Sequence, residues 1–199
     1  MKFFYVFLFI AFSYIFSLYI STNTQEKIMY HHDNKDKHLS KPSIIVNKIL
    51  DETSLYVEKK YKIQTVGKGV SMPGGTVKKL SLSFNSYENL SKDQLRKITL
   101  DFIEKLLNNI NSNSDIQPFL VKRPFTIENV SFFIANYDSK GYQLNDPEIG
   151  YSYYSNGKLV YKTYDPEKEF GYKNEFEETY EEALQLVQKG NQNQKNMVK

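Results

Sequence analysis

NLSKDQLRKITLDFIEKLLNNI, residues 89–110, decides the fold, because it predicts a long helix with one apolar face. Ser91 is followed three residues later by Gln94, which is the pattern of a capping box at a helix N-terminus. Apolar side chains then recur at helical spacing, namely Leu95, Ile98, Phe102, Ile103, Leu106 and Ile110. We expect this face to belong to the core of the domain.

The segments around this helix alternate between polar and apolar residues, which is typical of strands with one buried face. The first three predicted strands lie at residues 61–65, 79–84 and 130–137. The third is nearly apolar throughout, so we place it near the centre of the sheet. YSYYSNGKLVYKTY, residues 151–164, predicts a hairpin, because Asn156-Gly157 suits a type I′ turn in which both central residues have positive φ.

Two further helices complete the predicted domain. Residues 43–57 carry an apolar stripe formed by Val46, Ile49, Leu50, Thr53 and Val57. EFEETYEEALQLVQK, residues 175–189, has glutamates in its first turns and an apolar side. The order α-β-β-α-β-β-β-α predicts one α+β domain at residues 43–189, with an antiparallel sheet of about five strands and helices mainly on one face. Residues 190–199 are expected to be a disordered tail.

The N-terminal segment FFYVFLFIAFSYIFSLYI, residues 3–20, carries no charge. As a helix its 18 residues reach about 27 Å, close to the hydrocarbon thickness of a bilayer. It is longer than the usual apolar core of a signal peptide and lacks a small-residue cleavage pattern. We predict a membrane anchor, with a cleaved signal peptide as the open alternative, followed by a flexible polar stalk at residues 21–42.

The charges around this segment leave its orientation open. Lys2 favours a cytoplasmic N-terminus, whereas the lysines that follow the segment favour the opposite orientation. We expect the domain outside the cytoplasm, either membrane-anchored or secreted, because a hydrophobic N-terminal segment before an ordinary domain usually directs export.

Charge and composition exclude several classes of function. The net charge is only +3 and the chain has just two arginines, Arg96 and Arg123, so it shows no clustered basic stripe for nucleic acid. The absence of cysteine excludes disulfides, thiolate metal sites and a cysteine nucleophile. All three histidines lie in the stalk, so the domain also lacks an imidazole base for Ser-His-Asp catalysis. We expect no nucleic-acid partner and no cofactor.

The stalk segment HHDNKDKH gathers His31, His32 and His38 with Asp33 and Asp36. Imidazole and carboxylate groups are competent ligands for Zn²⁺ or Cu²⁺. A flexible, exposed cluster has neither fixed geometry nor hydrogen bonds that orient its ligands. We therefore favour a solvated linker, with metal binding as the open alternative.

A glycine-rich run, GKGVSMPGGTVKKLSLSF at residues 67–84, raises the question of phosphate binding. A phosphate loop of the G-x-x-x-x-G-K-[ST] type opens a helix and holds phosphate with its lysine. Here Gly75 occupies the lysine position, and the residues that follow alternate as a strand. We interpret residues 72–75 as a tight turn in a mobile loop that also includes Gly67 and Gly69. The alternative is a loop that contacts a ligand or partner.

The predicted hairpin sorts its tyrosines onto two sides. One side carries Tyr151, Tyr153, Lys158, Val160, Lys162 and Tyr164, and the other carries Tyr154, Leu159 and Tyr161. One side has to meet the core, which leaves the other to face solvent. A tyrosine-rich surface suits protein or glycan partners. The candidate contact residues are therefore Met72, Pro73, Gly74, Gly75, Tyr151, Tyr153, Lys162 and Tyr164.

Acidic residues flank the hairpin at Asp146, Glu148, Asp165, Glu167 and Glu169. Two carboxylates in a cleft can act as acid and base on a glycoside, although acidic residues beside Asn, Pro and Gly are more often turn formers. Our leading hypothesis is a non-catalytic binding or interaction domain outside the cytoplasm. The alternative is a glycan-directed hydrolase that uses these carboxylates.

Several motifs together carry a resemblance: SMPGG at 71–75, LSKDQLRK at 90–97, YKTYDPEKEFGYK at 161–173 and EETYEEAL at 177–184. In this combination the chain resembles small envelope or secreted proteins of host-associated bacteria over residues 43–189. The resemblance implies no particular activity, cofactor or site residue.

Overall fold

The computed structural model describes residues 39–168 and 171–197. The chain divides into two units, Met1–Ile44 and Ile45–Lys199, and of the first unit only residues 39–44 are described. The predicted anchor at 3–20 and the histidines of the stalk therefore lie outside the described residues. Among the residues that are described, no helix is both long and apolar enough to cross a membrane.

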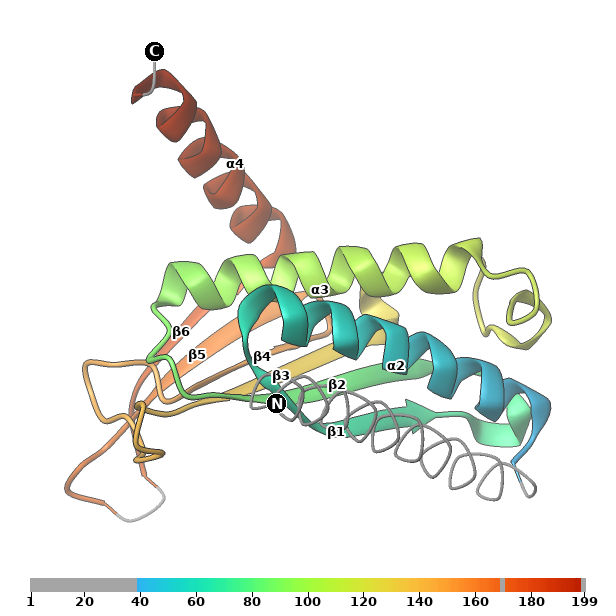
Figure 1. Ribbon diagram of the computed structural model, residues 1–199, viewed down its shortest axis with the longest axis horizontal. Helices are drawn as coiled ribbons and strands as arrows, with labels where there is room; N and C mark the ends of the chain where they lie inside the picture. Colours follow the sequence, from blue (N-terminus) through green and yellow to red (C-terminus); the bar gives the residue numbers. More distant parts are fainter. Residues whose placement is uncertain (1–38, 169–170, 198–199) are drawn as a thin grey trace, which may run out of the picture. The chain divides into compact units, whose positions relative to one another are not determined.

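Three α-helices and six strands make up the described part of the chain (Figure 1). The helices are α2 (Lys41–Tyr61), α3 (Lys92–Ser112) and α4 (Tyr180–Met197). The strands are β1 (Gln64–Ser71), β2 (Lys79–Ser86), β3 (Val130–Asn136), β4 (Tyr151–Ser155), β5 (Lys158–Tyr164) and β6 (Tyr172–Thr179). The α+β class predicted from the sequence is confirmed.

The strands form one mixed sheet in the order β1-β2-β3-β4-β5-β6. Neighbouring strands are antiparallel except for β2 and β3, which are parallel. A parallel pair needs a long crossover connection, and α3 with the loop after it provides one. The prediction of an antiparallel sheet of about five strands is wrong in these two respects: the sheet has six strands and is mixed.

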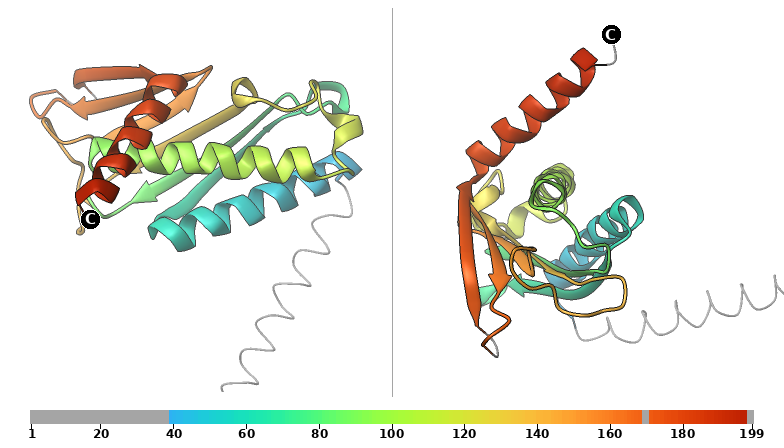
Figure 2. Two further views of the ribbon diagram at one scale, coloured as in Figure 1. Left: turned by 90° about the horizontal axis from the view of Figure 1, so that it is seen from above. Right: turned by 90° about the vertical axis from the view of Figure 1, so that its left-hand side faces the viewer.

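Helices α2 and α3 lie side by side on one face of the sheet (Figures 1 and 2). The predicted capping box is present, because the amide of Gln94 donates to Ser91 Oγ at 3.4 Å and the amide of Ser91 donates to Gln94 Oε1 at 2.9 Å. All the predicted apolar positions on both helices are buried. They pack in one hydrophobic core against apolar side chains of two strands, Leu80, Leu82 and Phe84 of β2 and Val130, Phe132 and Ile134 of β3.

The hairpin of β4 and β5 also has the predicted turn and register. Asn156 and Gly157 have φ angles of 52° and 82°, as a type I′ turn requires. Tyr153 lies opposite Val160 and Tyr151 lies opposite Lys162. The side of the hairpin that meets the core is the one formed by Tyr154, Leu159 and Tyr161, which belong to the hydrophobic core. Val160 on the other side is buried as well, but it lies outside that core.

The first predicted strand is misplaced, and two of its neighbouring glycines are not in a loop. Tyr61 ends α2, and β1 runs on through Gly67 and Gly69 to Ser71. A Cβ atom added to Gly69 would lie 2.1 Å from Ser81 Oγ, so the missing side chain makes room for a hydroxyl on the neighbouring strand. The turn itself is as expected, because both of its glycines have positive φ, 59° at Gly74 and 84° at Gly75.

Residues 172–179 form a strand where a helix was expected from residue 175. Glutamates favour a helix locally, but here Glu175 pairs with Lys162 at 2.7 Å and Glu177 pairs with Lys158 at 2.8 Å across the β5–β6 ladder. Helix α4 begins only at Tyr180. It continues past residue 190, where the sequence places the start of a disordered tail, and runs to Met197.

Candidate binding surface

No described helix covers the face of the sheet opposite α2 and α3 (Figure 2). Alternate residues of each strand point to this open face. On β4 and β5 the open face is the side of the hairpin that carries Tyr151, Tyr153 and Tyr164, because Tyr154 and Tyr161 point to the core. The tyrosines singled out in the sequence therefore share one uncovered surface.

Five aromatic side chains cluster on the open face, and we call them the aromatic patch: Phe133, Tyr151, Tyr153, Tyr164 and Tyr172. They come from β3, β4, β5 and β6. Tyr151 is the centre, with ring centroids 5.6 Å from Phe133, 6.2 Å from Tyr153, 5.9 Å from Tyr164 and 5.3 Å from Tyr172. These separations are those of interacting aromatic pairs.

The rings of the patch bury one another at its centre and remain exposed at its edge. Tyr151 is only 9% exposed, whereas Phe133 and Tyr172 are 36% and 48% exposed. Burial raises the pKa of Tyr151, and the neighbouring Tyr172 hydroxyl adds to the effect. Burial also raises the pKa of Tyr164. Both hydroxyl groups therefore stay protonated at neutral pH and can donate hydrogen bonds.

Gly150, just before β4, fixes the position of Tyr164. A Cβ atom at Gly150 would lie 2.2 Å from Cδ2 and 2.4 Å from Cε2 of the Tyr164 ring. The ring therefore lies directly against the backbone of Gly150. Any larger residue at this position has to displace one of the rings that form the patch.

The charged side chains beside the patch are paired with one another. Lys162 Nζ lies 2.7 Å from Glu175 and 4.7 Å from the centroid of the Tyr172 ring. Its hydrogen bond with Glu175 raises the pKa of Lys162. Lys158 pairs with Glu177 at 2.8 Å. The surface around the aromatic rings is therefore close to neutral.

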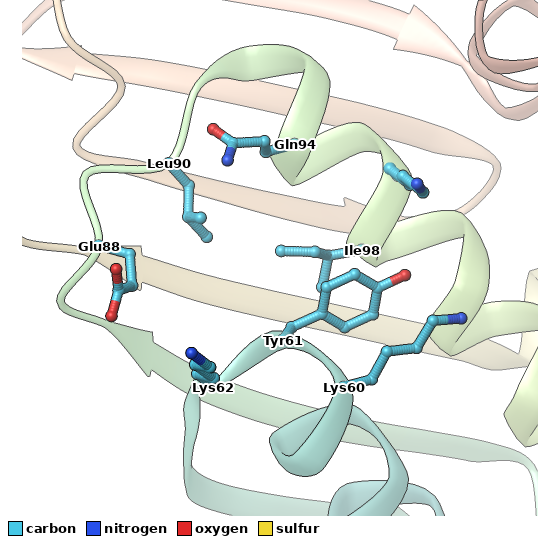
Figure 3. Close-up of a pocket in the computed structure, with 8 residues that line it drawn as sticks. Lys60, Tyr61, Lys62, Glu88, Leu90, Gln94 and Ile98 are labelled. Atoms are coloured by element: carbon cyan, nitrogen blue, oxygen red, sulfur yellow. The ribbon is translucent and has the colours of Figure 1, made fainter. Parts of the chain in front are cut away.

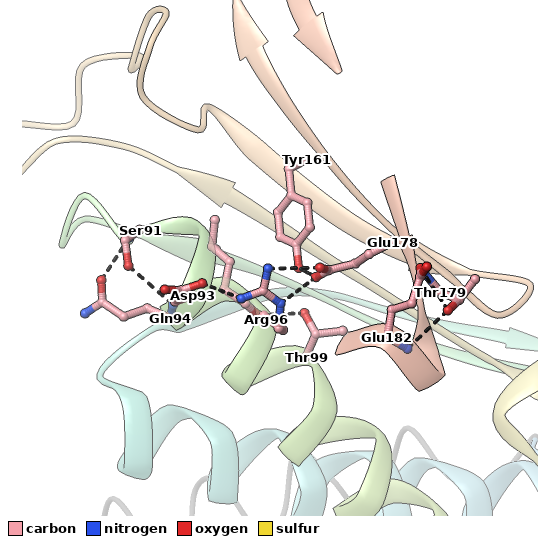
Figure 4. A network of polar contacts seen from close by, with 10 residues as sticks. Ser91, Asp93, Gln94, Arg96, Thr99, Tyr161, Glu178, Thr179 and Glu182 are labelled. Carbon is pink, nitrogen blue, oxygen red and sulfur yellow. Dashed lines mark hydrogen bonds and ion pairs between the residues drawn. The ribbon is translucent and has the colours of Figure 1, made fainter. Parts of the chain in front are cut away.

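Strand β6, which contributes Tyr172, is tied to α3 by a buried network (Figure 4). Arg96 donates through Nε and an Nη atom to the two carboxylate oxygens of Glu178, at 2.7 Å and 2.9 Å. Tyr161 donates its hydroxyl hydrogen to the same carboxylate, and Asp93 accepts from the guanidinium group. Burial raises the pKa of Tyr161. The network provides hydrogen-bond donors for the buried carboxylate of Glu178 on β6.

The four residues of the β1–β2 turn do not join the aromatic patch. Lys79, at the start of β2, donates to Ser155 Oγ at 3.1 Å and to Asn156 Oδ1 at 3.0 Å, so this turn shares its end of the sheet with the hairpin turn. Tyr151 and Tyr164 lie at the other ends of β4 and β5. Within the turn, Met72 packs against the core and only residues 73–75 are exposed.

Two members of the patch, Phe133 and Tyr172, were not among the predicted contact residues. The side chain of Phe133 could have been predicted to lie on the open face. Neighbouring residues of a strand point to opposite faces of the sheet, and Phe132 is buried in the core. Tyr172 carried no such signal, because its strand was not predicted. Its contact with Tyr164, at 5.6 Å between ring centroids, follows from the β5–β6 pairing.

The acidic residues around the hairpin have structural partners. Asp146 accepts from Thr163 Oγ1 at 2.9 Å and pairs with Lys173 at 3.3 Å. Glu148 accepts from Asn89 Nδ2 at 2.6 Å. Asp165 Oδ1 accepts from the backbone amide two residues on, at 3.0 Å. Glu167 is exposed in that turn and Glu169 lies outside the described residues, so a hydrolase that uses these carboxylates stays a prediction.

Within the described ranges, no group of three or more His, Asp or Glu side chains is arranged to hold a metal ion. The predicted metal ligands of the stalk, from His31 to His38, lie outside those ranges. Comparisons with protein-family models, with curated proteins and with solved structures give no match to this chain.

Proposed function

We propose that the chain is a non-catalytic binding protein that docks a protein partner on the aromatic patch. The observation that carries the proposal is the gathering of five aromatic side chains from four strands on a face that no described helix covers. Aromatic residues, tyrosine among them, are enriched in the centres of protein interfaces. Exposed aromatic side chains at the edge of a patch, here Phe133 and Tyr172, are a common feature of interaction sites.

The ring geometry favours a protein over a glycan. A sugar binds aromatic side chains through an open ring face, but here neighbouring rings cover much of one another. Tyr151 and Tyr153 stack at an interplanar angle of 23°, and Lys162 Nζ lies over one side of Tyr172. What the patch offers is a tight group of rings with protonated hydroxyl groups. A partner surface with apolar groups and hydrogen-bonding groups at its centre suits this arrangement.

Charge supports the same type of partner. Because Lys158 and Lys162 are paired with glutamates on β6, the surface beside the patch has no strong field of either sign. Charged residues are depleted at the centres of protein interfaces. We therefore expect binding that depends weakly on salt, unlike the steep salt dependence of interfaces formed by opposite charges.

The proposed location is outside the cytoplasm, on a membrane anchor or after secretion. The support is the uncharged segment at residues 3–20. Carbonate extraction of membranes tests the anchor, because a spanning segment resists extraction. Recovery of a soluble form whose sequence starts at about residues 22–26 would identify a cleaved signal peptide instead.

Site-specific photo-crosslinking in cells that make the protein tests the docking surface. A photoreactive phenylalanine analogue replaces Tyr172 in one variant and Tyr142 in the other. Tyr142 is a matched control, because it is 68% exposed and lies outside the patch. We expect a discrete crosslinked product with a second protein only from position 172. Equal products from both positions, or none from either, would contradict the proposal.

A further inference from the structure

A pocket of about 320 Å³ opens on the helix-covered side of the molecule (Figure 3). It lies where the end of α2 meets the start of α3 and the loop that follows β2. Its lining residues are Lys60, Tyr61, Lys62, Glu88, Leu90, Gln94, Lys97 and Ile98. The volume is at the lower end of the range found for small-molecule sites.

The pocket has an apolar interior and a basic rim. Leu90 and Ile98 are buried, and the Tyr61 ring lies beside Ile98 in the close-up (Figure 3). The Tyr61 hydroxyl donates to Asp101 Oδ2 at 2.8 Å, which holds the ring in place. The three lysines supply the basic groups. A ligand that fits this combination has an apolar body and a negative group.

The charge of the rim is only partly compensated. Lys60 Nζ lies 2.7 Å from Asp101 Oδ2, so its charge is already paired. Lys62 and Lys97 form no ion pair with another described residue. Glu88 is the one acidic residue in the lining. Counted over the described residues, two unpaired ammonium groups and one carboxylate leave room for a single negative charge.

The backbone of Lys62 points to a role for its side chain. Lys62 has a φ of 56° immediately after α2, and its amide donates to the carbonyl of Glu58 at 2.8 Å. This is the left-handed position that commonly ends a helix, where glycine is favoured because it has no Cβ. A lysine at this position accepts an unfavourable backbone conformation while placing its ammonium group at the rim.

From these observations we propose that the pocket binds a small organic carboxylate with an apolar body. The body lies against Tyr61, Leu90 and Ile98, and the carboxylate meets Lys62 and Lys97. This binding site is separate from the aromatic patch, because its residues come from the ends of α2 and α3 and the intervening loop rather than from the open face of the sheet.

The test is a titration of the full-length protein with phenylacetate through the millimolar range. Binding is monitored by the NMR chemical shifts of the backbone amides of the lining residues. We expect saturable shifts at Lys62, Leu90 and Lys97. Acetate, which lacks the body, and phenethylamine, which carries the opposite charge, should each bind at least fivefold more weakly. No saturable binding of phenylacetate would overturn the proposal. Equal binding of phenethylamine, or tighter binding of inorganic phosphate, would overturn it as well.

Variants separate binding from folding. Lys62→Gly removes the ammonium group and relieves the positive φ, so we expect the melting temperature to stay or rise while phenylacetate binds at least fivefold more weakly. Lys97→Gln should weaken binding to a similar extent. Lys59→Gln is the matched control, since Lys59 is exposed in the last turn of α2 and does not line the pocket. Unchanged binding in both Lys62→Gly and Lys97→Gln would contradict the site.

Discussion

Arg96 and Glu178 form a bidentate ion pair between α3 and β6, with donor–acceptor distances of 2.7 Å and 2.9 Å. Both side chains are buried. The pair holds in place the strand that carries Tyr172, so the open face depends on a contact made on the opposite side of the sheet. Removing one partner of such a pair leaves an uncompensated buried charge.

Arg96→Ala is therefore expected to lower the free energy of unfolding by about 3–5 kcal/mol, measured by urea denaturation. The double variant Arg96→Met, Glu178→Leu should recover much of this loss, because it removes both charges together. Arg123→Ala provides the control: Arg123 is exposed, and its loss should change stability by less than about 0.5 kcal/mol. Similar losses for Arg96→Ala and Arg123→Ala would show that the buried pair does not hold β6.

Gly150→Ala tests the packing beneath the aromatic patch. The added methyl group has to displace the Tyr164 ring, and overpacking of this kind costs about 1–3 kcal/mol. Combining it with Tyr164→Ser should cost less than the sum of the two single changes, because the obstructing ring is gone. Gly190→Ala is the control. Nothing lies within 4 Å of a Cβ atom there, and the helix should gain roughly 0.5–1 kcal/mol. Strict additivity at positions 150 and 164 would refute the contact.

The carboxyl group of Asp146 provides a prediction about pH. Hydrogen bonds from Thr163 and Asn174, together with Lys173, lower its pKa in the folded protein. A folded-state pKa below the unfolded value of about 3.9 stabilises the fold above that pH, and the stabilisation disappears as pH falls through the folded value. Wild type should therefore exceed Asp146→Asn in unfolding free energy at pH 7, and the difference should shrink as pH falls below the unfolded value. A difference that stays constant with pH would contradict this assignment.

Sequence reasoning succeeded where the signal was local. The capping box at Ser91, the apolar faces of α2 and α3, and the Asn156-Gly157 turn each depend on residues close together in the chain, and the structure has all of them. The hairpin register followed from the turn alone. Three of the patch residues, together with Lys162, could for that reason be named in advance.

Prediction from the sequence failed where residues far apart in the chain decide the local structure. The glutamates of β6 favour a helix by propensity, but Glu178 is bonded to Arg96, 82 residues away in the sequence. Tyr172 was not predicted as a contact residue, because its strand, β6, was not predicted. The parallel pairing of β2 and β3 also leaves no mark on either strand's own alternation pattern. The pocket could not be predicted from the sequence either, because its lining residues come from two separate segments, 60–62 and 88–98.

Affinity measurement is the most direct test of the aromatic patch as a docking surface. The protein crosslinked through position 172 is titrated against the full-length wild type, Tyr172→Ser and the control Tyr142→Ser. If the exposed edge of the patch is central to the interface, Tyr172→Ser should raise the dissociation constant by about tenfold or more. A tenfold rise is equivalent to a loss of about 1.4 kcal/mol in binding free energy. Tyr142→Ser should leave it within about twofold of wild type. Equal affinities for wild type and Tyr172→Ser would contradict the account.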